Sequence, residues 1–148
     1  MEHFIHIPTR SGNLAAVLHY PKTFGTNETR PCERWPVIIV CHGFLGSRVG
    51  VDRLFVKAAR QWSEAGFMVV RFDYAGCGES EGRYGEGGLE AMIDQTRRVI
   101  DYVHAIDCVD QGRIALLGHS LGGAVALLTA AADSRVKTLI LWSAVAHP

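Results

Sequence analysis

Short apolar runs alternate with segments of helical periodicity along most of this chain, and this rhythm constrains the fold more than any other feature. The runs at residues 37–43, 67–74, 113–120 and 136–145 are rich in β-branched and aliphatic residues and too short for typical helices. We therefore expect strands that are buried on both faces. Strands that alternate with helices imply right-handed crossovers and a mostly parallel sheet. The sequence predicts a doubly wound α/β fold with helices on both faces of the sheet.

Three segments between and after these runs have the pattern expected of helices. Residues 51–65 repeat apolar side chains at helical spacing and stop before Gly66, which suits a helix C-terminus. Residues 88–106 follow the i, i+3, i+4, i+7 pattern with charged residues on the opposite face. Residues 121–133 are small and apolar, as expected of a buried helix. These segments supply the crossover connections that a parallel sheet requires.

The first 36 residues predict a different local structure. Residues 3–21 alternate in polarity around a Ser11-Gly12-Asn13 turn, which is typical of a half-buried hairpin. Residues 22–36 carry turn formers and charge, so we expect a loop. With 148 residues, 48% of them hydrophobic and 20% charged, the chain can bury one core, and we expect residues 1–148 to form a single domain.

Charge and cysteine usage exclude several classes of partner. The chain carries 15 basic and 15 acidic residues, so no long-range field favours nucleic acid or anionic lipid, and we expect neither as a partner. No apolar stretch is long enough for a signal peptide or a membrane span. The four cysteines form no C-x-x-C pair, which suits a reducing compartment, and we expect a cytoplasmic protein. The seven histidines show no metal-ligand spacing, so no metal site is expected.

A serine flanked by glycines stands where the run 113–120 meets the third helical segment. Gly118-His119-Ser120-Leu121-Gly122 fits the pattern G-x-S-x-G, and its position between a strand and a helix is the context that this motif requires. On so sharp a turn the neighbours two residues away must lack Cβ atoms, and Gly118 and Gly122 meet this need. The pattern predicts Ser120 as an exposed nucleophile; the alternative is an ordinary helix-capping serine.

Two backbone N–H groups are candidates to stabilise an oxyanion beside Ser120. The N–H of Leu121 is predicted to lie at a helix N-terminus, where the dipole favours negative charge. The second candidate is the N–H of Phe44, which follows the strand ending at Gly43, a residue that lets the backbone approach closely. We expect His42 to hold this loop by hydrogen bonds rather than to act as a base.

The stretch "DYAGCGESEG", residues 73–82, superficially suggests a nucleotide-binding loop. Its glycines are spaced G-x-G-x-x-x-G rather than G-x-G-x-x-G, and its glutamates would repel a pyrophosphate. We expect a structural turn instead, fixed by Asp73 or Ser80 through bonds from side chain to backbone.

Taken together, "VIIVCHGFLGS", "FMVVRFDYAGCGESEG" and "RIALLGHSLGGAVAL" resemble the N-terminal half of an α/β-hydrolase. The resemblance is strongest to the cinnamoyl and feruloyl esterase-like and serine aminopeptidase-like branches. It implies Ser120 as nucleophile, Phe44 and Leu121 as oxyanion donors, no cofactor, and hydrolysis of small esters or amides through an acyl-enzyme. Cys77 departs from it, since many relatives carry histidine there.

The groups that would activate Ser120 are harder to place. This fold orders its catalytic triad along the chain as serine, acid and histidine. After Ser120, Asp133 is the only acidic residue and His147 is the only histidine. Asp133 is expected in a solvated loop remote from Ser120, His147 has no evident orienting acid, and His119 should point elsewhere. Resembling enzymes continue for about another hundred residues, so the resemblance implies a partial domain truncated after its sixth strand.

Three interpretations follow for a chain with a nucleophile but no assigned base. In the favoured one, the chain is part of a larger hydrolase and is inactive alone. In the second, another polypeptide supplies the acid and the base. In the third, the chain is a non-catalytic binding or dimerisation module, with self-association through the open edge of strand 136–145.

Overall fold

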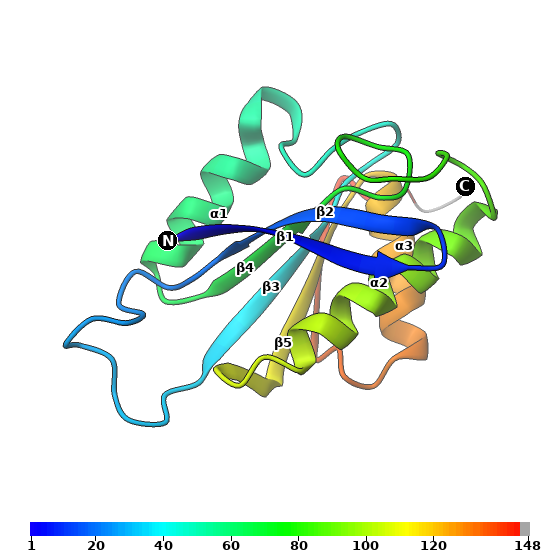
Figure 1. Ribbon diagram of the computed structural model, residues 1–148. Coiled ribbons are helices and arrows are strands. Elements are labelled where there is room, and N and C mark those ends of the chain that lie inside the picture. The colour runs from blue at the N-terminus through cyan, green and yellow to red at the C-terminus, as the bar shows by residue number, and fades with distance from the viewer. Residues whose placement is uncertain (146–148) are drawn as a thin grey trace.

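A six-stranded sheet organises residues 1–145, the part of the chain that the computed structural model describes (Figure 1). The strands are β1 (Glu2–Thr9), β2 (Gly12–His19), β3 (Trp35–Cys41), β4 (Met68–Phe72), β5 (Val109–His119) and β6 (Thr138–Trp142). They lie in the order β1-β2-β4-β3-β5-β6. Strands β4, β3, β5 and β6 are parallel, and the antiparallel hairpin β1–β2 pairs with β4. The predicted mostly parallel sheet is confirmed.

Helices cover both faces of this sheet, as Figure 1 shows. Helix α1 (Leu54–Glu64) packs on one face, and α2 (Gly88–His104) and α3 (Leu121–Ala132) pack on the other. Successive residues of a strand point to opposite faces, so the central strands supply two cores. In β3, Ile39 joins the core beneath α2 and α3, whereas Ile38 joins the core beneath α1. Within the described residues, no helix has the length and apolar character needed to cross a membrane.

The start of the first helix differs from the prediction. Residues 51–53 form a separate 3-10 turn, and Asp52 and Arg53 have φ angles of 52° and 60°. This break leaves Val51 76% exposed and Leu54 40% exposed, so the helix predicted over residues 51–65 begins three residues later than expected. The predicted end is confirmed, because Gly66 has a φ of 100° and Phe67 N–H donates to Trp62 O at 3.0 Å.

The last strand is also less buried than expected. In β6, Thr138 and Leu141 are exposed, and the other three residues are half-buried. Within the described residues β6 pairs with β5 alone, and the helix α1 reaches it through a contact between Trp62 and Trp142, whose ring centroids are 5.8 Å apart. The prediction of a strand buried on both faces was therefore wrong. Self-association through residues 136–145 stays a prediction.

Candidate active site

Ser120 occupies a sharp turn between the end of β5 and the start of α3. Its backbone has φ 55° and ψ −122°, a conformation that residues with a Cβ rarely adopt. Hydrogen bonds hold it there, since Ser120 N–H donates to Trp142 O at 3.0 Å and Ser120 O accepts from Gly123 N–H at 2.9 Å. Val145 N–H donates to the same carbonyl oxygen at 3.1 Å. The strained strand-to-helix turn expected from the sequence is present.

The two flanking glycines are required by close contacts between backbones. A Cβ on Gly118 would lie 2.4 Å from Gly122 O, and a Cβ on Gly122 would lie 2.2 Å from Cys41 O. Neither contact can be relieved by rotating a side chain. The glycines therefore allow β5, α3 and the end of β3 to meet around Ser120.

The hydroxyl of Ser120 has a different task from capping its helix. Ser120 is the N-cap residue of α3, but its side chain makes no capping hydrogen bond. Instead it lines a cavity of about 520 Å³ at the carboxyl ends of β3 and β5. The lining residues are His42, Gly43, Phe44, Leu45, Gly46, Ser47, Gly50, Val51, Phe55, Gly78, His119 and Ser120. The helix-capping interpretation is therefore not supported.

The loop after β3 brings Phe44, one of the two residues predicted to supply an oxyanion donor, to this cavity. A Cβ on Gly43 would lie 3.1 Å from Ser120 Cβ and 3.6 Å from Ser120 Oγ, so the backbone at Gly43 passes directly beside the serine. Within residues 1–145, no hydrogen-bond acceptor is found for the N–H of Phe44 or of Leu121. Both amides are thus available to a ligand atom.

His42 supports this loop as expected. Its Nε2 accepts a hydrogen bond from Tyr74 N–H at 3.0 Å, and its Nδ1 lies 2.8 Å from Gly43 O, to which it can donate. Burial lowers the pKa of His42, which favours the neutral ring that these two bonds require. With both ring nitrogens engaged, His42 has no free acceptor for the proton of Ser120. The prediction that it holds the loop is confirmed.

The described residues bring no base to the serine. His119 packs edge-on against Phe55, with ring centroids 5.8 Å apart, and no histidine of residues 1–145 is hydrogen-bonded to Ser120 Oγ. His147 lies outside the described residues. His119 also lines the cavity beside Ser120, so the expectation that it points elsewhere stays a prediction.

Asp133 is buried, contrary to the prediction of a solvated loop residue. It is 5% exposed and accepts hydrogen bonds from the Arg135 side chain at 2.7 and 3.0 Å. Arg97 contributes a further ion pair at 3.5 Å. The hydrogen bonds from Arg135 lower the pKa of Asp133 to about 2. These contacts give Asp133 a structural role between α3 and β6, where sequence spacing did not reveal its arginine partners.

A buried carboxylate, Asp73, anchors the turn that follows β4. Its Oδ2 accepts from Glu79 N–H at 3.0 Å, and its backbone oxygen accepts from the Ser80 hydroxyl at 2.6 Å. Ser80 Oγ in turn accepts from Ala15 N–H at 2.8 Å, which ties the turn to β2. The prediction that Asp73 or Ser80 fixes this turn is confirmed for both residues.

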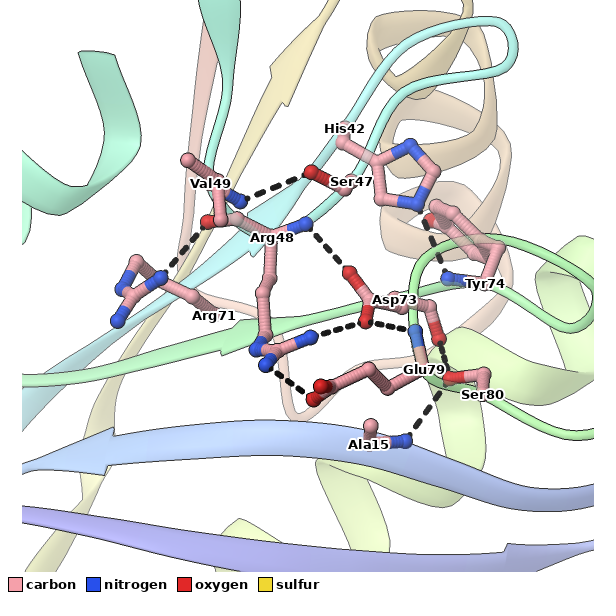
Figure 2. A network of polar contacts seen from close by, with 10 residues as sticks. All are labelled: Ala15, His42, Ser47, Arg48, Val49, Arg71, Asp73, Tyr74, Glu79 and Ser80. Carbon is pink, nitrogen blue, oxygen red and sulfur yellow. Dashed lines mark hydrogen bonds and ion pairs between the residues drawn. The ribbon is translucent and has the colours of Figure 1, made fainter. Parts of the chain in front are cut away.

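An arginine pair that the sequence analysis missed connects this turn to the loop after β3 (Figure 2). Arg48 binds Asp73 and Glu79 through its guanidinium group, and Arg71 Nη1 donates to Arg48 O at 2.9 Å. Arg71 lies within β4 and is 5% exposed. A charged residue inside the apolar run 67–74 was the available signal, because a buried cation requires partners. No comparable signal marks Arg48 in its loop.

The arginine network continues to His19, which should make stability depend on pH. Arg71 Nε donates to His19 Nε2 at 2.9 Å, and burial lowers the pKa of His19 from 6.5 to about 4. The unfolded chain binds a proton in this range that the folded chain excludes. We expect the free energy of unfolding to fall by about 3 kcal/mol as pH drops from 6.5 towards 4.

Urea unfolding of the protein between neutral pH and about pH 4.5 measures this dependence. His19→Gln should weaken it, whereas His3→Gln, at an exposed position of β1, should retain it. An unchanged pH profile in the His19 variant would show that another group is responsible.

The fold and the site together define a class of protein. A mostly parallel sheet with helices on both faces, and a strained serine between a strand and a helix, is the arrangement of the nucleophile elbow. Residues 36–148 match the family model described as alpha/beta hydrolase fold. The chain belongs to this family, as its three motifs predicted.

Known proteins similar to the chain are considerably longer. An uncharacterised 31.7 kDa protein of Escherichia coli is 40% identical over 105 residues, which are 71% of this chain and 36% of that protein. The structure of Est1E from Butyrivibrio proteoclasticus with ferulic acid is 30% identical with a TM-score of 0.79, covering 91% of this chain and 50% of that one. A serine hydrolase without a lid from Xanthomonas campestris is 27% identical with a TM-score of 0.73, covering 95% and 60%.

Proposed function

We propose that this chain carries the nucleophile and the oxyanion donors of a serine hydrolase that cleaves carboxylic esters, with amides as the alternative. The observation that carries the proposal is the strained Ser120, whose hydroxyl lines a cavity instead of capping α3. In this reaction Ser120 Oγ bonds to the acyl carbon while its proton passes to a base. The negative charge on the acyl oxygen is stabilised by Phe44 N–H and Leu121 N–H. The leaving group departs with a proton, and water then releases the acid.

The lining of the cavity favours neutral substrates. No lysine, arginine, aspartate or glutamate is found among its lining residues in the described part of the chain. A charged substrate group would therefore lose its hydration without gaining an ion pair, which is unfavourable. Phe44, Leu45 and Val51 each expose more than half of their surface there and offer apolar contacts. The ferulic acid in Est1E is compatible with an aromatic acyl group at this place.

The acid and the base belong to residues outside this chain in our proposal. It is supported by the absence of a histidine hydrogen-bonded to Ser120 Oγ within residues 1–145. It is also supported by the engagement of Asp133 with Arg135 and Arg97. Without a base, a serine hydroxyl is a weak nucleophile, so residues 1–148 alone should react slowly.

Labelling with a fluorophosphonate probe tests both parts of the proposal. We expect the complete natural polypeptide that contains these residues to be labelled, because the probe needs an activated serine. Ser120→Ala should abolish labelling, whereas Ser134→Ala, an exposed serine after α3, should leave it unchanged. Residues 1–148 by themselves should be labelled at least ~1000-fold more slowly.

Two results would contradict these expectations separately. Labelling that persists in Ser120→Ala would exclude Ser120 as the nucleophile. Rapid labelling of residues 1–148 alone would show instead that the base lies within them. Labelling that requires a second polypeptide would favour a site shared between two chains.

A further inference from the structure

The loop that carries Phe44 has no regular secondary structure to hold it. Residues 42–50 connect β3 to the 3-10 turn at Val51–Arg53 and form turns without strand or helix pairing. A backbone donor stabilises an oxyanion only when its direction is fixed before the reaction. The contacts that fix this loop therefore bear directly on the proposed function.

Most of these contacts converge on Arg48. Its backbone N–H donates to Asp73 Oδ1 at 2.6 Å, and its guanidinium group binds Asp73 Oδ2. The same guanidinium group donates to Glu79 Oε2 at 2.6 Å, and Arg48 O accepts from Arg71 at 2.9 Å. Figure 2 shows Arg48 between Asp73, Glu79 and Arg71, so that main chain and side chain are held at once.

The environment makes this attachment rigid. Asp73 is completely buried, and the side chain of Arg48 is 14% exposed, so the ion pair between them is shielded from solvent. Asp73 is fixed in turn, since Glu79 N–H donates to its carboxylate. Removing one partner of such an ion pair leaves the other as a buried charge without a compensating charge.

We infer that Arg48 is a positioning residue, which aims the N–H of Phe44 at the oxyanion by fastening its loop to Asp73. The inference rests on the proposed function. At the near end of the loop, His42 binds Gly43 O, and Leu45 N–H lies 3.3 Å from the hydroxyl of Tyr84. Arg48 holds the far end, four residues from Phe44. Loss of this attachment frees the loop without removing any group that contacts the substrate.

Arginine has properties at this place that lysine lacks. Its planar group donates in two directions, which allows it to bind Asp73 and Glu79 together. Its charge also lies 5.4 Å from the ring centroid of Phe4. Lysine would retain the charge but could not reproduce the forked contact. Arg48→Lys should therefore reduce activity less than Arg48→Met does.

The test compares an ester with the matching thionoester in the complete polypeptide. An oxyanion site stabilises developing charge on oxygen better than on sulfur, so the ratio of the two rates reports how well the donors are aimed. For Arg48→Met we expect kcat on the ester to fall by roughly 10-fold to 100-fold, while KM changes by less than about 3-fold. The ratio of the ester rate to the thionoester rate should fall together with kcat. Arg98→Met is the matched control, because Arg98 also pairs with two carboxylates, Asp94 and Asp101, on the exposed side of α2.

The outcomes separate this inference from the proposed function. An unchanged rate ratio in a folded Arg48→Met variant would overturn the positioning role. If that variant fails to fold, Arg48→Lys decides: a reduced ratio supports the role, and an unchanged ratio overturns it. Persistent activity in Ser120→Ala would instead remove the proposed function itself.

Discussion

Replacing Ser120 with glycine is expected to abolish turnover and to stabilise the protein at the same time. Under the proposed function this change removes the nucleophile, which should lower ester turnover by about 10^5-fold or more. The backbone at position 120 has φ 55° and ψ −122°, which costs a residue with a Cβ free energy and costs glycine little. We therefore expect the free energy of unfolding to rise by about 1 to 2 kcal/mol.

Ser120→Ala is the control for this expectation. It removes the same hydroxyl but retains the Cβ, so it should lose turnover equally without the gain in stability. Urea unfolding of the three proteins measures the difference. If Ser120→Gly proved no more stable than Ser120→Ala, the backbone at this position would carry no strain.

Replacing Gly122 with alanine should have the largest effect on the fold. The new Cβ would lie 2.2 Å from Cys41 O and 2.3 Å from His42 O, and both are backbone atoms that cannot rotate away. Helix α3 and the end of β3 would have to separate. We expect the free energy of unfolding of Gly122→Ala to fall by about 4 kcal/mol, even though alanine is intrinsically favoured over glycine in a helix by about 1 kcal/mol.

Gly112→Ala provides the comparison. Gly112 lies near the start of β5, and the nearest atom to its new Cβ is a side-chain oxygen of Asp110 at 3.3 Å. Gly112→Ala should change the free energy of unfolding by no more than about 0.5 kcal/mol. Far-UV circular dichroism during urea unfolding compares both variants. A Gly122→Ala protein as stable as the original would contradict the close approach of α3 to β3.

Local sequence patterns predicted those parts of the site that depend on chain order. An apolar run is followed directly by a helical segment, which predicts a sharp turn between them. Ser120 lies at the apex of this turn, between the end of β5 and the start of α3. The helix end at Gly66 and the positions of the central strands along the chain were predictable for the same reason. Each depends on neighbours within a few positions along the chain.

Features that depend on distant partners could not be predicted in this way. Arg48 lies 25 positions from Asp73, and Arg97, which pairs with Asp133 beside Arg135, is 36 positions from it. The exposure of β6 depends on what packs against a sheet edge, which periodicity does not report. Val51 is exposed because the backbone of Asp52 and Arg53 is left-handed, and neither residue is a glycine that would indicate such a conformation from the sequence.

The bond from Ser120 N–H to Trp142 O has a consequence for synthesis on the ribosome. A nascent chain can complete β5 and begin α3 well before residue 142 leaves the exit tunnel. The turn lacks that restraint until residue 142 is available, so this hydrogen bond forms only after β1 to β5 have been synthesised.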